Sequence, residues 1–175
     1  GSVFGSASFG FVQGQSPEIN LYAETSKLPT AAARQLWPYW LGKKGRQWVL
    51  NNLYGGTIRN GHIQLAIPSG HFRVCAKIPF TDDQFQIDFD IERARMNVAG
   101  DIPPLRDTIG HLTLRGTSVT VDVDSATAYF PTGRTVAVSD GVFAIPSTDE
   151  QPLMANINMA VSGHADAVAE LITYH

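Results

Sequence analysis

The chain has 175 residues, of which 43% are hydrophobic and only 17% charged, and its formal net charge is −3 at pH 7. This length is sufficient for one domain with its own core, and the slight acidic excess argues against a nucleic-acid-binding protein. The single cysteine, Cys75, excludes a disulfide within the chain and a zinc site built from several cysteines.

The sequence contains no recognisable membrane-spanning or signal segment. No apolar run reaches the roughly 18 residues that a spanning helix needs. The opening stretch, GSVFGSASFGFVQG, lacks the basic region and the continuous apolar region of a signal peptide. Gly1-Ser2 is interpreted as a cloning remnant. We therefore expect residues 1–175 to be a single β-rich domain cut from a longer protein.

Alternation of apolar and polar side chains dominates the sequence. The alternating segments, in chain order, are EINLYAE (18–24), HIQLAI (62–67), FRVCAKIPF (72–80), FQIDFDIE (85–92), VTVDVD (119–124) and ANINMAV (155–161). A period of two residues is the signature of a strand with one buried face. After Ile91 the alternation changes phase, since Met96 and Val98 are apolar at even positions. This change predicts a bulge near Arg93-Ala94.

Helical character is confined to two regions. Residues 30–54 contain all three tryptophans, Trp37, Trp40 and Trp48. We expect a helix that begins after Pro29, with Thr30 as its N-cap, and a second helix that ends at Gly55-Gly56. Residues 164–175 form the second region and are the candidate for a third helix. The tryptophans are expected to pack the helices on a sheet and to shield its edge; contact with lipid or a neighbouring repeat is the alternative.

Turn signals separate the strands and predict an antiparallel meander. They are Asn60-Gly61, Ser69-Gly70, Asp82-Asp83, Pro103-Pro104, Arg115-Gly116, Pro131-Thr132-Gly133 and Asp140-Gly141. Segments 57–69 and 135–147 both end in Ala-Ile-Pro-Ser, so a weak internal repeat is a further prediction.

Strands with one apolar face need a cover. With little helix available, the cover is a second sheet, closure into a barrel, or a ligand held against a curved open sheet. The alternation alone favours a β-sandwich.

The segment LWPYWLGKKGRQWVLNNLYGGTIRNGHIQL (36–65) resembles the central region of large AsmA-like proteins of the bacterial envelope, of the YhdP type. The matching features are Trp37-Pro38, the basic helix Lys43–Trp48, Gly55-Gly56, and the strand from Gly61 to Leu65. A second segment, DIPPLRDTIGHLTLRGTSVTVDV (101–123), resembles the same family through Pro104, Leu105, Asp107, Gly110 and Gly116. Together the two segments are spread across most of residues 34–124. The chain lacks the N-terminal membrane helix of the full-length family members.

The resemblance implies a mainly β fold with a curved, twisted antiparallel sheet that forms an open trough, together with two or three short helices. It implies a non-catalytic segment that binds phospholipid acyl chains and relays them between the inner and outer membranes, in contact with adjacent repeats of its parent chain. It places the protein in the periplasm, with membrane contact only through parts outside this piece. The residues expected to line the trough are Ile63, Leu65, Ile67, Phe85, Ile87, Phe89, Ile91, Val119, Val121 and Val123.

Two other functions remain open at the sequence level. A structural or interaction module would use the same strands in a closed sandwich. An enzyme acting on envelope carbohydrate or lipid would need two facing carboxylates or an activated serine, and no such motif is recognisable. The histidines show no metal-ligand spacing, and no metal or cofactor is expected. The acidic residues at alternate strand positions are expected to form a polar outer face.

Overall fold

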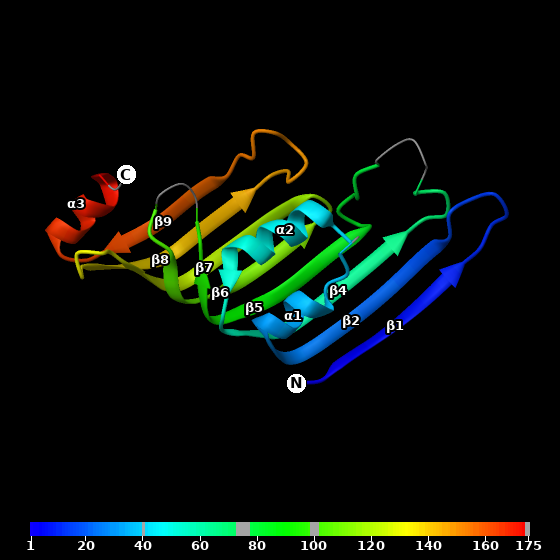
Figure 1. The fold of residues 1–175 in the computed structure, drawn as a ribbon, viewed down its shortest axis with the longest axis horizontal. Coiled ribbons are helices and arrows are strands. Elements are labelled where there is room, and N and C mark those ends of the chain that lie inside the picture. Colours follow the sequence, from blue (N-terminus) through cyan, green and yellow to red (C-terminus); the bar gives the residue numbers. More distant parts are fainter. Residues whose placement is uncertain (40, 73–77, 99–101, 174–175) are drawn as a thin grey trace.

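The computed structural model describes residues 1–39, 41–72, 78–98 and 102–173. It is mainly β, with one open antiparallel sheet of nine strands and three short helices (Figure 1). Eight strands lie side by side in the order β1-β2-β4-β5-β6-β7-β8-β9, and the short β3 pairs with β5. The strands are β1 (Val3–Gly10), β2 (Glu18–Pro29), β3 (Leu53–Tyr54), β4 (Thr57–Ile67), β5 (Phe85–Met96), β6 (Leu105–Arg115), β7 (Ser118–Tyr129), β8 (Thr135–Ile145) and β9 (Asn156–Ser162).

The sandwich alternative is wrong, because every described strand belongs to this one sheet. The apolar face of the sheet is covered instead by helices. Helices α1 (Thr30–Leu36) and α2 (Lys43–Asn52) lie across the central strands, and α3 (Ala165–Thr173) lies beside β8 and β9 (Figure 1). We call the helix-covered face the inner face and the opposite one the outer face.

The predicted alternation is confirmed in the central strands. On β5, the side chains of Phe85, Ile87, Phe89 and Ile91 are at most 4% exposed, while the residues between them are partly exposed on the outer face. The predicted strand at 72–80 is wrong for Phe72 and for residues 78–80, which lie in a loop. The rest of that segment, including Cys75, lies outside the described residues.

Bulges interrupt several strands near their middle. The predicted bulge at Arg93-Ala94 is confirmed, since Arg93 has a φ of 54° and the register between β5 and β6 shifts there. The turns predicted at Asn60-Gly61 and Asp140-Gly141 are wrong, because Asn60 and Asp140 lie inside β4 and β8 with φ near 50°. Asn and Asp tolerate the left-handed conformation, which suits a hairpin turn and a bulge alike.

Residues 30–54, the helical insert, occupy the place of a turn between two paired strands. Pro29 at the end of β2 pairs with Thr57 at the start of β4, so the insert leaves and re-enters the sheet at one point. The prediction of Thr30 as N-cap is wrong: Pro29 holds that position, and Thr30 is the first residue of α1, with its side chain buried. Its backbone N–H donates to the carbonyl oxygen of Gly56 at 3.3 Å.

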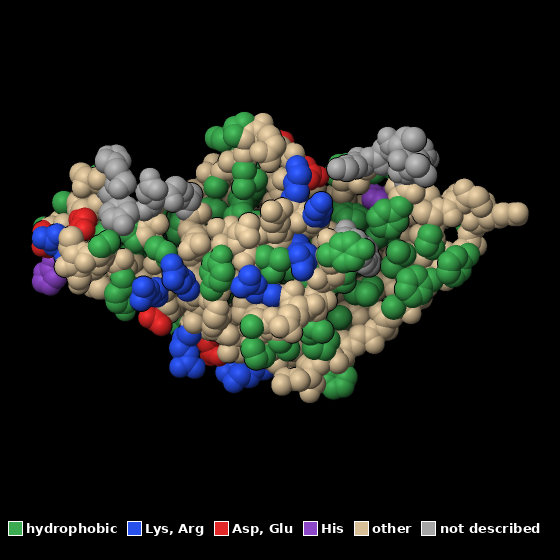
Figure 2. Space-filling model, in the orientation of Figure 1, with side chains coloured by type: hydrophobic (Ala, Val, Ile, Leu, Met, Phe, Trp, Pro, Cys, Tyr) green, Lys and Arg blue, Asp and Glu red, His purple; other side chains and the backbone are tan. Residues whose placement is uncertain are grey.

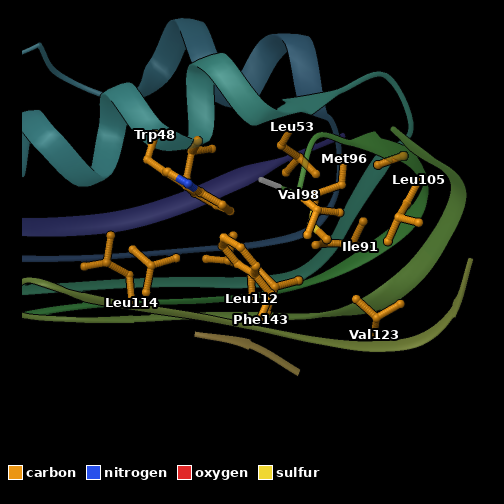
Figure 3. Close-up of a cluster of buried hydrophobic side chains, with 14 of the residues drawn as sticks. Trp48, Leu53, Ile91, Met96, Val98, Leu105, Leu112, Leu114, Val123 and Phe143 are labelled. Carbon is orange, nitrogen blue, oxygen red and sulfur yellow. The ribbon is translucent and has the colours of Figure 1, made fainter. Parts of the chain in front are cut away.

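Two tryptophans hold the insert against the inner face, and Figure 3 shows Trp48 directed from its helix toward the sheet. The Trp48 ring stacks on Phe143 of β8, and Trp37 meets Phe85 of β5 edge-on, with ring centroids 6.3 Å apart. Both tryptophans are only 8% exposed. The predicted packing role is therefore confirmed for Trp37 and Trp48, whereas Trp40 lies outside the described residues.

At Gly45, helix α2 lies close to the sheet. A Cβ atom at Gly45 would lie 2.9 Å from Cδ1 of Leu114 on β6. Two arginines brace the helices against each other: Arg34 donates to the Leu50 carbonyl at 2.7 Å, and Arg46 donates to the Trp37 carbonyl at 3.1 Å. The insert is thus tied together by its own polar contacts as well as by the sheet.

Candidate functional site

A cavity of about 360 Å³ lies between the helical insert and the inner face of β2, β4 and β5. Its floor includes a row of side chains that crosses three paired strands, namely Ala23, Ile63 and Ile87. Ala33 and Trp37 contribute to the helical wall. The volume falls within the few hundred Å³ of typical small-molecule pockets, and the lining is predominantly apolar.

Small side chains explain why the insert does not fill this space. Ala23 on β2, Gly61 on β4 and Ala33 on α1 all line the cavity. Farther along the sheet, the large rings of Trp48 and Phe143 occupy the corresponding space between helix and strands. The insert therefore closes over the centre of the sheet and leaves room beneath α1.

The cavity borders solvent on the side of the N-terminal edge strand. Among its lining residues, Val3 on β1 is 49% exposed and Leu36 at the end of α1 is 60% exposed. Apolar side chains gather over α1 and along β1 and β2 in Figure 2. A hydrocarbon chain entering here would thus meet apolar surface at the mouth and along the floor.

Three of the charged residues that border the cavity have their charged groups hydrogen-bonded to other residues of the chain. Arg34 donates to the Leu50 carbonyl, and its guanidinium lies 5.1 Å from the centre of the Tyr54 ring. The Asp88 carboxylate accepts two hydrogen bonds from Arg115, at 2.7 and 2.8 Å.

The third such group is the carboxylate of Glu24, which accepts a hydrogen bond from the Tyr22 hydroxyl at 2.9 Å. This bond, followed by desolvation, raises the pKa of Tyr22. Each of these three charged groups therefore has a polar partner within the chain.

The structure divides the predicted trough residues into two groups. Ile63, Ile87 and Phe89 line the cavity. Ile63 is partly buried, whereas Ile87 and Phe89 are at most 4% exposed and also belong to the packed core. The other seven belong to the same core and do not line the cavity: Leu65, Ile67, Phe85, Ile91, Val119, Val121 and Val123. Within the described residues, most of the predicted apolar floor is thus already covered by side chains of the chain itself.

Sequence reasoning missed Leu21, Ala23 and Ala33 as lining residues. The alternation of residues 18–24 placed Leu21 and Ala23 on one face, but alternation does not distinguish a packed position from an open one. The usable signal was small size, since Ala23 and Ala33 are the positions where the wall leaves volume.

Apolar side chains continue along the inner face to both edges of the sheet. Phe9 of β1 pairs opposite Ile19 and is 58% exposed. At the other edge, Ile157 and Val161 of β9 pair with the buried Phe143 and Val138 but are themselves 37% and 38% exposed. Neither edge strand contains a charged residue or a proline, and such groups are common protection against edge pairing.

Polar side chains on the outer face are bonded to one another. The Asp90 carboxylate accepts hydrogen bonds from His111 Nδ1 and from Asn60 Nδ2, both at 2.8 Å, and these bonds lower its pKa. Arg59 donates to Glu92 at 2.8 Å and lowers the pKa of that carboxyl. Nowhere in the described part of the chain do three or more His, Cys, Asp or Glu side chains form a group that could hold a metal ion.

Comparison of the chain with protein-family models, with curated proteins and with solved structures gives no match. Of the helices that the structure describes, none has the length and apolar character needed to cross a bilayer.

Proposed function

We propose that this chain binds acyl chains of phospholipids, without a catalytic step, as a segment of an AsmA-like envelope protein that relays phospholipid between the inner and outer membranes. The observation that carries the proposal is the apolar cavity of about 360 Å³ beneath α1, with its apolar mouth at Val3 and Leu36. The resemblance of residues 34–124 to the AsmA-like family supports the same assignment.

The energetics of a lipid chain explain why such a surface is needed. Each CH₂ group exposed to water costs about 0.8 kcal/mol, so a chain of about 16 carbons costs on the order of 12 kcal/mol. A relay must therefore keep apolar surface against the chain at each step. The cavity and the partly exposed inner-face side chains at both edges, including Phe9 and Ile157, provide apolar surface of this kind.

The proposal places the chain in the periplasm, with the membrane anchor in a segment outside residues 1–175. Its partners are acyl chains and adjacent repeats of the same parent protein. The uncharged edge strands β1 and β9 are suited to these repeats, because an unprotected edge can extend a sheet by further strand pairing.

Photo-crosslinking tests the proposal. The chain is exported to the periplasm of a Gram-negative host with azidophenylalanine at Phe89, which lines the cavity, or at Ala137, which is exposed on β8. After irradiation and purification, mass spectrometry is expected to find phospholipid adducts at position 89 and none at position 137. Phospholipid is also expected in a solvent extract of the unmodified chain. The proposal would be contradicted if no phospholipid adduct formed at position 89 and the solvent extract of the unmodified chain contained no phospholipid.

A structural or interaction module is the second candidate, and the packing of the helical insert favours it. Nine of the ten predicted trough residues lie in the core, all but Ile63, as expected if the inner face serves only to hold the insert. This candidate predicts no adduct at position 89 and a chain that purifies without lipid.

A further inference from the structure

We propose that the cavity beneath α1 takes one hydrocarbon chain, selects it by length, and is indifferent to the charge of its head group. This inference rests on the proposed function and names the ligand class for the same site. Two features of the cavity carry it: its volume and the balance of the charges around it.

The volume limits the ligand to a single chain. If a CH₂ group occupies roughly the 30 Å³ that one water molecule takes in the liquid, a cavity of about 360 Å³ holds about twelve such groups. A second chain of similar length does not fit. Chain segments beyond this length remain at the mouth, near Val3 and Leu36.

The charges make the site indifferent to the head group. Glu24, Arg34 and Asp88 border the cavity. Asp88 is paired with the oppositely charged Arg115, and the charges of Glu24 and Arg34 are opposite in sign. The exposed lining residues at the mouth, Val3 and Leu36, are apolar. Because these charges offset one another, a head group left at the mouth meets no net charge that favours an anion over a cation or a neutral group.

These two features define a specific pattern of affinity. Each added CH₂ group that enters the cavity should tighten binding about fourfold, which corresponds to ~0.8 kcal/mol. The gain should stop at roughly twelve carbons, when the cavity is full. At equal chain length, anionic, neutral and cationic amphiphiles should bind with similar affinity.

The test uses three series of amphiphiles with chains of 8 to 16 carbons: alkanoates, alkanols and alkyltrimethylammonium salts. Affinities are measured by isothermal titration calorimetry below the critical micelle concentration, on the whole chain. Ala23→Trp is expected to move the plateau to shorter chains, because the indole occupies part of the cavity. Ala137→Trp, on the outer face of β8, is the matched control and should leave the plateau unchanged.

The outcomes separate this inference from the proposed function. A preference of tenfold or more for one head-group charge, or affinity that keeps rising to 16 carbons, would overturn the inference and leave lipid binding intact. Phospholipid adducts at position 89 without measurable binding of any amphiphile would also overturn the inference and leave the proposed lipid binding intact. No binding in all three series together with no adduct would overturn both.

Discussion

The indole of Trp48 stacks on the ring of Phe143, with ring centroids 5.2 Å apart and the planes 19° from parallel. This contact joins α2 to β8, so the helical insert packs on strands far from the β2–β4 connection in which it lies. Together with the edge-on pair of Trp37 and Phe85, it makes the insert part of the core.

Replacing Trp48 by alanine is expected to lower the free energy of unfolding by about 3–5 kcal/mol, because a large buried ring is lost and a cavity remains. Urea unfolding followed by circular dichroism measures the change. Tyr39→Ala is the matched control, since Tyr39 is 79% exposed and its loss should change stability by no more than about 0.5 kcal/mol. Equal effects of the two substitutions would mean that the insert is not packed on the sheet.

The bulge in β4 gives a second prediction. Asn60 has a φ of 48° and its side chain donates to Asp90. Asn60→Val should destabilise the fold by about 1–2 kcal/mol from backbone strain, in addition to the lost hydrogen bond. Asn60→Gly loses the same bond but tolerates the conformation, so it should cost less. Equal urea midpoints for the two variants would contradict the positive φ at this position.

The pH dependence of stability gives a third prediction, which concerns Asp90. Hydrogen bonds from His111 and Asn60 hold its pKa below the ordinary value of 3.8. A carboxyl whose pKa is lowered in the folded state stabilises that state above its unfolded pKa, and the contribution is lost as pH falls through the folded pKa. Asp90→Asn should therefore be less stable than the wild type at neutral pH, and the difference should close as the pH falls below 3.8.

The difference in unfolding free energy between the wild type and Asp90→Asn at neutral pH should be within about 1 kcal/mol, because the Asp90 side chain is 43% exposed and exposed ion pairs contribute little. Asp124→Asn is the matched control, since Asp124 on the outer face of β7 has no hydrogen-bond or ion-pair partner within the described ranges. A stability gap for Asp90→Asn that stays constant from neutral pH to pH 3 would contradict the assigned bonds.

Local periodicity was sufficient to predict which face of each central strand is buried. It placed Phe85 and Ile91 inward and also located the phase change at Arg93, because both are properties of consecutive residues. It could not separate a turn from a bulge at Asn60-Gly61 and Asp140-Gly141. Both structures use a residue that tolerates positive φ, and the choice depends on whether the chain continues along the same neighbouring strand.

The candidate site was harder to predict, because it depends on how the helical insert sits on the sheet. The apolar pattern treated Val121 and Ile63 alike, whereas the insert buries the first in the core and leaves the second at the cavity floor. Only contacts between distant segments, such as Trp48 on Phe143, decide this difference. The small residues Ala23 and Ala33 lie at the open region. A small side chain leaves a cavity only where the side chains packed opposite it do not fill the space, and the sequence does not show which side chains these are.

The most direct test of the account is whether filling the cavity removes the lipid. Ala23→Trp and Ala137→Trp carry the same substitution on the inner face of β2 and the outer face of β8, and lipid bound to each purified chain is quantified by mass spectrometry after solvent extraction. We predict at least a tenfold lower lipid content for Ala23→Trp than for Ala137→Trp, with both variants folded by circular dichroism. Equal lipid content in the two folded variants would contradict binding in this cavity.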